Sequence, residues 1–358
     1  MTVQSLSLDA PSPSWIDRLV DAGLLPDAVI RAGIRRLLRQ RLLDEQRGGP
    51  EATWERQRRL WRRLDHGPIA EQVQAANVQH YEVPPALFGW MLGPHLKYSA
   101  CLWEPGTTSL GQAEAAMLAL TCERADLADG QRILELGCGW GSLTLWMAGH
   151  FPGARIVAVS NSRDQGAYIR EQAEARGLAN VEVVTADMNS FAPSGTFDRV
   201  VSVEMFEHMR NHRELMRRIS TWLAPGGRLF VHIFTHRELS YLFEPKDSAD
   251  WMSREFFSGG IMPADALLLR HQEHLHLEEH WRVDGAHYQC TAEAWLQNLD
   301  AHRAEVLKLF HRTYGPDQAP ARFHRWRVFL MACAELWGWR GQDWLVSHYR
   351  FLKPEAHP

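Results

Sequence analysis

Two carboxylates and an imidazole lie close together in the run EMFEH, residues 204–208. At helical spacing Glu204, Glu207 and His208 would share one face. Such a group must share protons or bind a cation, because unpaired like charges at this spacing repel and raise one pKa. The run directly follows a predicted strand at 198–203, so it lies at the carboxyl edge of a sheet, which favours a reacting centre. The alternative is a solvated helix start, where acidic side chains favour the dipole.

A glycine-rich run, ELGCGWG, begins at Glu135 and carries Gly137, Gly139 and Gly141. Glycines allow the chain to turn sharply and the backbone to approach a ligand closely. A dinucleotide fingerprint would need another glycine where this chain has Ser142, and an acidic residue about 20 positions further on. The pattern is instead typical of S-adenosylmethionine-dependent methyltransferases. A glycine turn of purely structural use is the alternative.

Side chains after the second and third predicted strands fit the same cofactor. Asn161 can hydrogen-bond a ribose hydroxyl, and Gln165 lies one helical turn further on. Asp187 ends the third strand and Met188 follows it, where similar methyltransferases hold the adenine. For Asp187, the cap of a helix is a competing role.

The elements that position these residues follow from short apolar runs separated by amphipathic segments. Buried strands rich in Val, Ile and Leu are predicted at 132–136, 155–160, 181–186, 198–203 and 228–234. Helices are predicted at 162–176 and at 211–223, the second with Asn211 as N-cap. This alternation predicts an α/β fold, a parallel sheet with helices on both faces.

The chain divides into four predicted parts. They are a helical, Arg-rich segment at 1–75, a Rossmann-like cofactor-binding core at 76–235, a lid or substrate insertion with the return to the sheet at 236–300, and C-terminal helices with the last strand at 301–358. Leu37, Leu38, Leu42 and Leu43 form an apolar stripe in the first part. It predicts docking against the protein, or else a surface that meets anionic lipid or a partner subunit.

Several of these runs together resemble the cyclopropane fatty acid synthase superfamily, and within it the coclaurine N-methyltransferase-like enzymes of benzylisoquinoline alkaloids. The runs are 133–142 (ILELGCGWGS), 201–209 (VSVEMFEHM), 98–99 (YS), 231–233 (VHI) and 281–288 (WRVDGAHY). The likeness extends from about residue 15 to about residue 354. It implies a class I methyltransferase fold with a mainly parallel seven-stranded sheet, an N-terminal helical segment and a lid insertion after strand five.

The resemblance also implies site residues. Cyclopropane synthases bind a bicarbonate base through four residues, which match Cys101, Glu207, His232 and Tyr288 here. Those synthases have a glycine where this chain has Glu204. A second carboxylate disfavours an anion and favours a cation, and amine-methylating relatives use such a cluster. His232 is equally well explained as a buried core histidine.

The remaining site residues follow from the same match. Tyr98 and Ser99 resemble residues that close over the cofactor. Relatives line the substrate cavity with aromatic rings at positions that match Tyr81, Phe257, Tyr288, Trp326 and Phe329. Such rings can stack on a flat substrate and stabilise a cation. Core packing is the competing role of each ring.

Two enzyme activities follow. In the first, a methyl group passes from S-adenosylmethionine to a small aralkylamine or tetrahydroisoquinoline-like amine; Glu207 with His208 removes the amine proton, and Glu204 orients the amine. In the second, the acceptor is an unsaturated lipid chain, bicarbonate is the base, and the Arg-rich segment contacts a membrane. A third possibility, a non-catalytic cofactor-binding protein, predicts decay of the reacting centre, whereas every expected residue is present.

Composition narrows these possibilities. A net charge of −4 over 358 residues gives no general basic field, which argues against nucleic-acid binding. Five scattered cysteines without a CxxC pair predict neither a disulfide framework nor a metal site. No apolar run reaches the roughly 20 residues of a membrane span, and the first residues lack a signal-peptide pattern. We therefore expect a cytoplasmic enzyme that needs no metal and acts on a small molecule, and the sequence leaves open whether it forms a homodimer.

Overall fold

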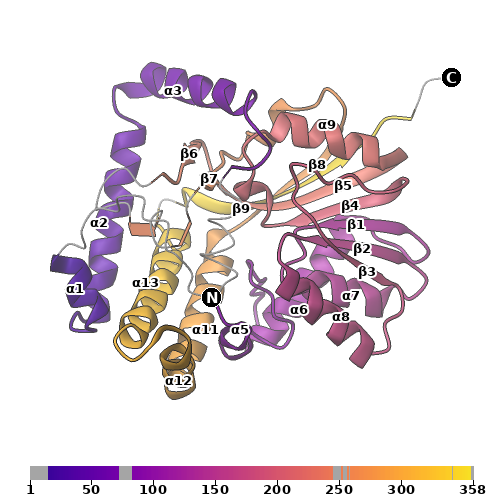
Figure 1. The fold of residues 1–358 in the computed structure, drawn as a ribbon. Coiled ribbons are helices and arrows are strands. Elements are labelled where there is room, and N and C mark those ends of the chain that lie inside the picture. The colour runs from indigo at the N-terminus through magenta and orange to yellow at the C-terminus, as the bar shows by residue number, and fades with distance from the viewer. Residues whose placement is uncertain are drawn as a thin grey trace.

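The computed structural model describes residues 15–71, 83–244, 251–252, 256–257, 259–340 and 342–355. Its centre is a seven-stranded sheet in the order β3-β2-β1-β4-β5-β9-β8 (Figure 1). The strands are β1 (Arg132–Leu136), β2 (Arg155–Ser160), β3 (Val181–Thr185), β4 (Phe197–Val203), β5 (Leu223–His236), β8 (His276–Val283) and β9 (Trp344–Leu352). Strands β1 to β5 pair in parallel, and β9 runs antiparallel to β5 and β8. The predicted class I methyltransferase sheet is confirmed.

Helices cover both faces of the sheet, as the alternating pattern predicts. Helices α6 (Leu110–Arg124), α7 (Ser142–His150) and α8 (Arg163–Ala175) pack on one face, and α9 (His212–Trp222) packs on the other (Figure 1). Asn211 caps α9 as predicted, because its side chain accepts a hydrogen bond from the backbone amide of Glu214. The carboxyl ends of β1, β2 and β4 therefore meet at one edge between the two helical layers.

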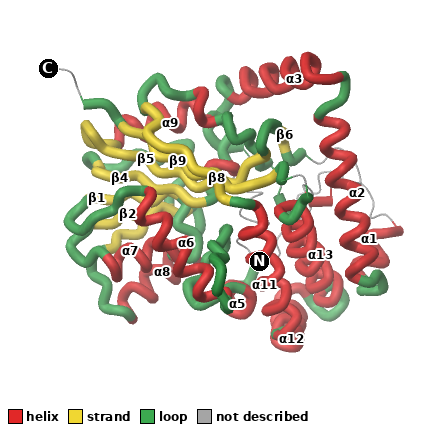
Figure 2. The backbone as a smooth tube through the Cα atoms, turned by 180° about the vertical axis from the view of Figure 1, so that it is seen from behind, coloured by secondary structure: helices red, strands yellow, loops and turns green. Residues whose placement is uncertain are grey.

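Helices α1 (Trp15–Asp21) and α2 (Asp27–Glu45) pack on the C-terminal helices, on the side away from β1–β3 (Figures 1 and 2). The C-terminal helices are α11 (Gly285–Ala301), α12 (Arg303–Tyr314) and α13 (Ala319–Trp337), and α5 (Pro85–Met91) lies next to α11. Helix α3 (Gly49–Leu64) lies apart from them, and its Trp61 and Leu64 pack on the insertion after β5. Arg31 of α2 forms ion pairs with Glu293 and Glu335, at 2.6 and 3.1 Å. Part of the basic charge of α2 thus meets acidic side chains of α11 and α13.

The apolar stripe of α2 divides in two. Leu38 and Leu42 pack against the core cluster formed with α13 and its neighbours, whereas Leu37 and Leu43 are exposed. Docking against the protein therefore explains only half of the stripe. Among the described residues, no helix combines the length and apolar character that crossing a membrane requires.

The insertion after β5 is anchored to the sheet through Asp265. It contains a two-stranded pair, β6 (Tyr241–Leu242) and β7 (Ile261–Met262), and a short 3₁₀ turn at Leu268–Arg270. The Asp265 carboxylate accepts hydrogen bonds from His280 (2.9 Å), Arg282 (2.6 Å) and Ser347 (2.6 Å) of β8 and β9. Burial alone would raise the pKa of Asp265, but these hydrogen bonds lower it to about 2.

Replacing Asp265 with alanine should lower the free energy of unfolding by about 2–3 kcal/mol, because the buried hydroxyl of Ser347 and the largely buried imidazole of His280 lose this acceptor. Urea denaturation followed by circular dichroism measures the change. Asp343→Ala, which removes an ion pair with Arg237 that is about half exposed, should cost at most about 1 kcal/mol. Equal losses in the two variants would contradict the anchoring role of Asp265. In the wild type, the stabilisation that ionised Asp265 provides should be fully present above pH ~4 and lost as the pH falls through about 2.

Candidate active site

The glycine loop after β1 is shaped by close packing. The backbone amides of Gly137 and Cys138 both donate to the Val159 carbonyl of β2, at 3.0 Å. Gly137 has a φ of 80°, and a Cβ there would lie 2.6 Å from the Cβ of Met205. The loop therefore fits tightly against the segment that follows β4. Here glycine is required both by the backbone conformation and by the neighbouring side chain.

Gly139 differs, because its missing side chain faces open space. Its φ is 51°, and a Cβ built there would meet no atom within 4 Å. The loop lines a large pocket. Several buried polar atoms of the pocket lining lack a hydrogen-bond partner among the described residues, including Trp140 Nε1, Ser142 Oγ and Gln165 Nε2. Free donors around a glycine cradle fit a cofactor with ribose hydroxyls and ring nitrogens.

Most residues predicted to bind the cofactor line this one pocket. Those that do are Tyr98, Ser99, Glu135, Gly137, Gly139, Asn161, Gln165, Asp187 and Met188. Gly141 lies behind the loop, where a Cβ would be 2.6 Å from Ile169 of α8. Gln165 is oriented by Ser160, whose hydroxyl donates to its Oε1 at 2.8 Å and leaves the amide nitrogen free. Asp187 also caps a turn, accepting from the Asn189 amide at 2.8 Å, so both of its proposed roles are compatible.

Glu135 is a buried acid at the end of β1. Burial raises its pKa to about 7, and the hydroxyl of Thr144, which donates to Oε2 at 2.5 Å, opposes this shift. Thr144 belongs to α7, so this bond ties the loop to the helix that follows it.

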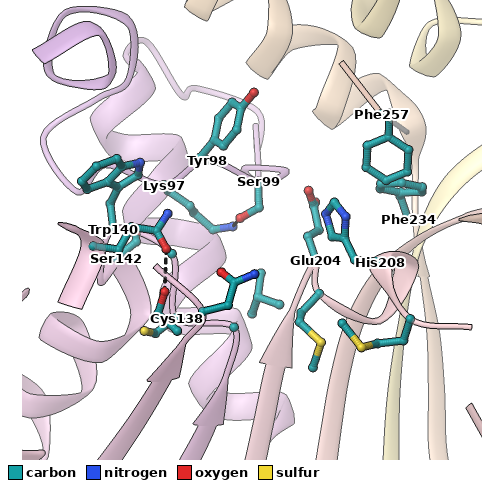
Figure 3. Close-up of a pocket in the computed structure, with 18 of the residues that line it drawn as sticks. Lys97, Tyr98, Ser99, Cys138, Trp140, Ser142, Glu204, His208, Phe234 and Phe257 are labelled. Carbon is teal, nitrogen blue, oxygen red and sulfur yellow. Dashed lines mark hydrogen bonds between the residues drawn. The ribbon is translucent and has the colours of Figure 1, made fainter. Parts of the chain in front are cut away.

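Glu204 is not on a helical face with Glu207 and His208, which corrects the spacing argument. It directly follows β4 with a φ of 47°, and only Phe206–His208 forms a short 3₁₀ turn. Figure 3 shows Glu204 and His208 side by side on the pocket wall, across from Lys97. Glu207 is fully buried and does not line the pocket. Because a left-handed residue separates the strand from the turn, helical periodicity fails here.

The Glu204 carboxylate is held by three donors from three different elements. Oε1 accepts from the Ala100 backbone amide at 2.9 Å and from His232 Nε2 at 3.2 Å, and Oε2 accepts from the Tyr288 hydroxyl at 2.7 Å. The side chain is 9% exposed. Burial raises the pKa of Glu204 above its usual value, and the positive charge of Lys97 and the donors from Ala100 and Tyr288 offset only part of this shift.

Glu207 and His208 have different surroundings. Neither carboxyl oxygen of Glu207 has a hydrogen-bond partner among the described residues, and burial together with the charge of Glu204 raises its pKa well above the usual range. Burial lowers the pKa of His208 to about 4, so its imidazole is neutral near pH 7. His208 lines the pocket, and its ring lies 4.8 Å from that of Phe257.

The residues that match the bicarbonate site do not surround an open space in this chain. Tyr288 lines the pocket, whereas Cys101 and His232 are buried behind its wall. Tyr288 and His232 both bond to Glu204. Burial raises the pKa of the Cys101 thiol to about 12, so it carries no charge near neutrality. The carboxylate of Glu204 thus takes the two donors that would otherwise be available to an anion.

The predicted aromatic residues fall into three groups. Phe257, Tyr288 and Phe329 line the pocket. Trp326 does not; it packs on Phe256, with ring centres 5.3 Å apart, in agreement with the core-packing alternative. Tyr81 lies outside the described residues.

Sequence reasoning missed several lining residues. The most notable is Lys97, a buried lysine whose ammonium donates to Ser99 Oγ (2.5 Å) and to the Ala100 carbonyl (2.8 Å). It braces the turn that presents the Ala100 amide to Glu204. A lysine directly before the motif YS was a signal that could have found it. Other missed lining residues include apolar and aromatic side chains from distant elements, among them Phe234, Phe243, Met252, Trp295, Leu336 and Trp337.

Together, the sheet order, the glycine loop and the pocket at the strand ends define an S-adenosylmethionine-dependent class I methyltransferase. Residues 70–343 match the mycolic acid cyclopropane synthetase family. The chain belongs to this family.

The relatives of this chain include amine and lipid enzymes. It is 37% identical to (S)-coclaurine N-methyltransferase of Thalictrum flavum subsp. glaucum, over 96% of this chain and 98% of the relative. A crystal structure of coclaurine N-methyltransferase bound to N-methylheliamine and SAH is similar with a TM-score of 0.91 and 35% identity, over 94% of this chain and 99% of the other. Cyclopropane-fatty-acyl-phospholipid synthase of Escherichia coli strain K12 is 30% identical, over 72% of this chain and 62% of the relative.

The two loop glycines give a prediction that separates folding from cofactor binding. Gly139→Ala should keep the fold, with a cost of about 1–2 kcal/mol for a left-handed alanine, but should weaken binding of S-adenosylhomocysteine because the new methyl group enters the pocket. Gly137→Ala should lower the melting temperature further, because its Cβ collides with Met205. Thermal melts and titration calorimetry measure the two effects. Unchanged affinity in Gly139→Ala would show that the cofactor does not border this residue.

Proposed function

We propose that this protein is an S-adenosylmethionine-dependent N-methyltransferase of a small aralkylamine or tetrahydroisoquinoline-like amine. The observation that carries the proposal is the nearly buried carboxylate of Glu204, held by three donors on the wall of an aromatic pocket. Similarity to amine-methylating relatives along nearly the whole chain supports it.

Glu204 has the features of an ammonium ligand. Three hydrogen-bond donors favour its ionised, acceptor-only form. A carboxylate offers about four acceptor positions, so one remains for a substrate N–H on the side of the pocket. An ammonium bound there would be flanked by aromatic rings, which stabilise a cation further.

His208 is the base next to the pocket in this mechanism, and Glu207 acts with it from behind the wall. The neutral imidazole of His208 takes the proton from the bound ammonium and leaves a free lone pair on nitrogen. The charge of Glu204 stabilises the imidazolium that forms, since it raises the pKa of His208. Glu207 lies directly before His208 in the same short turn, where burial and the charge of Glu204 raise its pKa well above the usual range.

S-adenosylmethionine would supply the methyl group: the amine lone pair would form the new N–C bond, and the electrons of the broken C–S bond would stay on sulfur. The residues that would hold it are the glycine loop, Gln165 and Asp187. Phe257, Tyr288 and Phe329 would then restrict the amine to the in-line approach that this displacement needs.

Replacing Glu204 with glutamine should lower kcat/KM for the amine by roughly 10- to 100-fold, mainly through KM, since a charge-assisted hydrogen bond is worth about 1.5–3 kcal/mol. Binding of S-adenosylhomocysteine should not change. The measurement is transfer of a labelled methyl group to a panel of aralkylamines. Glu238→Gln, which removes an exposed acid at the end of β5, is the control for net charge. Wild-type kinetics in Glu204→Gln would rule out the amine-binding role of Glu204.

Amine turnover should not depend on bicarbonate, because Glu204 already accepts the donors of Tyr288 and His232. The test compares rates in buffer freed of carbon dioxide with rates after addition of bicarbonate, and includes vesicles of an unsaturated phospholipid as a second acceptor. Methylation of the lipid together with a bicarbonate requirement would reverse the proposal in favour of the lipid activity.

A further inference from the structure

A row of side chains crosses the sheet behind Glu204. His232 of β5 pairs directly with His348 of β9, and His348 pairs with Trp281 of β8. Cross-strand partners project from the same face of a sheet, so the three side chains form one line toward the edge strand. Arg124, the last residue of α6, closes the row: its guanidinium carbon lies 5.0 Å from the centre of the Trp281 ring.

Short hydrogen bonds join this row to the pocket. Arg124 Nη1 lies 2.8 Å from His348 Nδ1, and His348 Nε2 lies 2.9 Å from His232 Nδ1. His232 Nε2 lies 3.2 Å from Glu204 Oε1. Both histidines are completely buried. The mechanism above uses neither His348 nor Arg124.

The direction of every hydrogen bond in the chain follows from its outer end. A guanidinium only donates, so His348 Nδ1 must be an acceptor and its proton lies on Nε2. His348 Nε2 then donates to His232 Nδ1, which places the His232 proton on Nε2 as well. His232 therefore donates to Glu204. Because Arg124 cannot accept a proton, this row of hydrogen bonds does not carry protons away from the pocket. It orients the hydrogen-bond donors toward Glu204.

The charges around the chain agree with this direction. Burial and the nearby cations Lys97 and Arg124 lower the pKa of both histidines well below the usual range, so both are neutral. The ionisable groups around Glu204 are Lys97, Cys101, Glu207, His208, His232, Tyr288 and Cys333. The two oriented imidazole dipoles thus present their positive ends to Glu204 and extend the effect of the Arg124 charge.

We propose that Arg124 and His348 are positioning residues, which fix the tautomer of His232 and thereby keep Glu204 ionised and oriented for the substrate amine. The role of Glu204 toward the substrate amine rests on the proposed function, whereas the assignment of the histidine tautomers does not. Without Arg124, His232 is free to carry its proton on Nδ1. It would then turn a lone pair toward Glu204, which favours the protonated carboxyl and removes the ammonium ligand.

The tautomers can be tested in the wild-type protein by NMR of ¹⁵N-labelled histidine. We expect His348 and His232 to be neutral and protonated on Nε2 between pH 6 and 8, with the signals assigned by their loss or shift in His348→Gln. In Arg124→Met, the Nε2-protonated form should no longer dominate. A wild-type His348 protonated on Nδ1, or on both nitrogens, would overturn the proposal, whatever the enzyme methylates.

Kinetics tests the consequence for Glu204. In Arg124→Met the acidic limb of the pH profile of kcat/KM should move to higher pH by about one unit, and KM for the amine at pH 7 should rise roughly tenfold. Arg124→Lys, which keeps a cationic donor, should restore part of the shift. Arg228→Met is the control, because Arg228 also pairs with Glu278, at 2.8 Å, and no hydrogen bond joins its side chain to Arg124 or to either histidine among the described residues.

The two proposals fail in distinguishable ways. An unchanged pH profile in Arg124→Met, combined with the loss of activity in Glu204→Gln, would overturn the positioning role and leave the amine mechanism intact. The predicted tautomers together with wild-type kinetics in Glu204→Gln would instead overturn the function of Glu204. If Arg124→Met does not fold, the positioning role is tested by the NMR signals of the wild type and by the pH profile of kcat/KM in Arg124→Lys.

Discussion

The buried charge of Glu204 is the constraint on which the rest of the site depends. A carboxylate with little access to water is stable only when donors surround it, and here the donors come from separate parts of the chain. Ala100 lies in the turn before α6, His232 in β5 and Tyr288 in α11. Glu204 therefore has all three of its donors only after the loop before α6, the sheet and α11 have come together.

This dependence extends through packing to the outer helices. The ring of Tyr288 stacks on Trp337 of α13, with centres 4.8 Å apart and planes within 6°. Helix α13 is in turn held by α2 through the ion pairs of Arg31 and Arg35 with Glu335. The Arg-rich N-terminal segment thus supports the site from a distance. Because these ion pairs are partly buried and two arginines share one carboxylate, they should stabilise the fold more than isolated surface ion pairs do.

Most of the fold was accessible from the sequence, because buried parallel strands appear as short apolar runs and the glycine loop has a recognisable pattern. The positions of Glu204 and His208 at the pocket also followed from their place after β4. The orientation of Glu207 did not. Local spacing placed Glu207 beside Glu204. In the structure the backbone at Glu204 is left-handed, and the next residue packs closely against the glycine loop. This backbone turns Glu207 away from the pocket. Contacts between distant segments decide such a geometry, and periodicity does not contain them.

A single position can determine which base such a site uses. The resemblance implies glycine at this position in cyclopropane synthases. A glycine here would leave no carboxylate of the chain between Tyr288 and His232, so an external anion could accept their hydrogen bonds. With glutamate, the chain's own carboxylate accepts them, and an anion would meet both occupied donors and a like charge. The same donors then serve to hold a group that attracts a cation. On the proposed assignment, lipid and amine enzymes share the same hydrogen-bond donors. They differ in the acceptor of these bonds, which is an external anion in the lipid enzymes and the Glu204 carboxylate here.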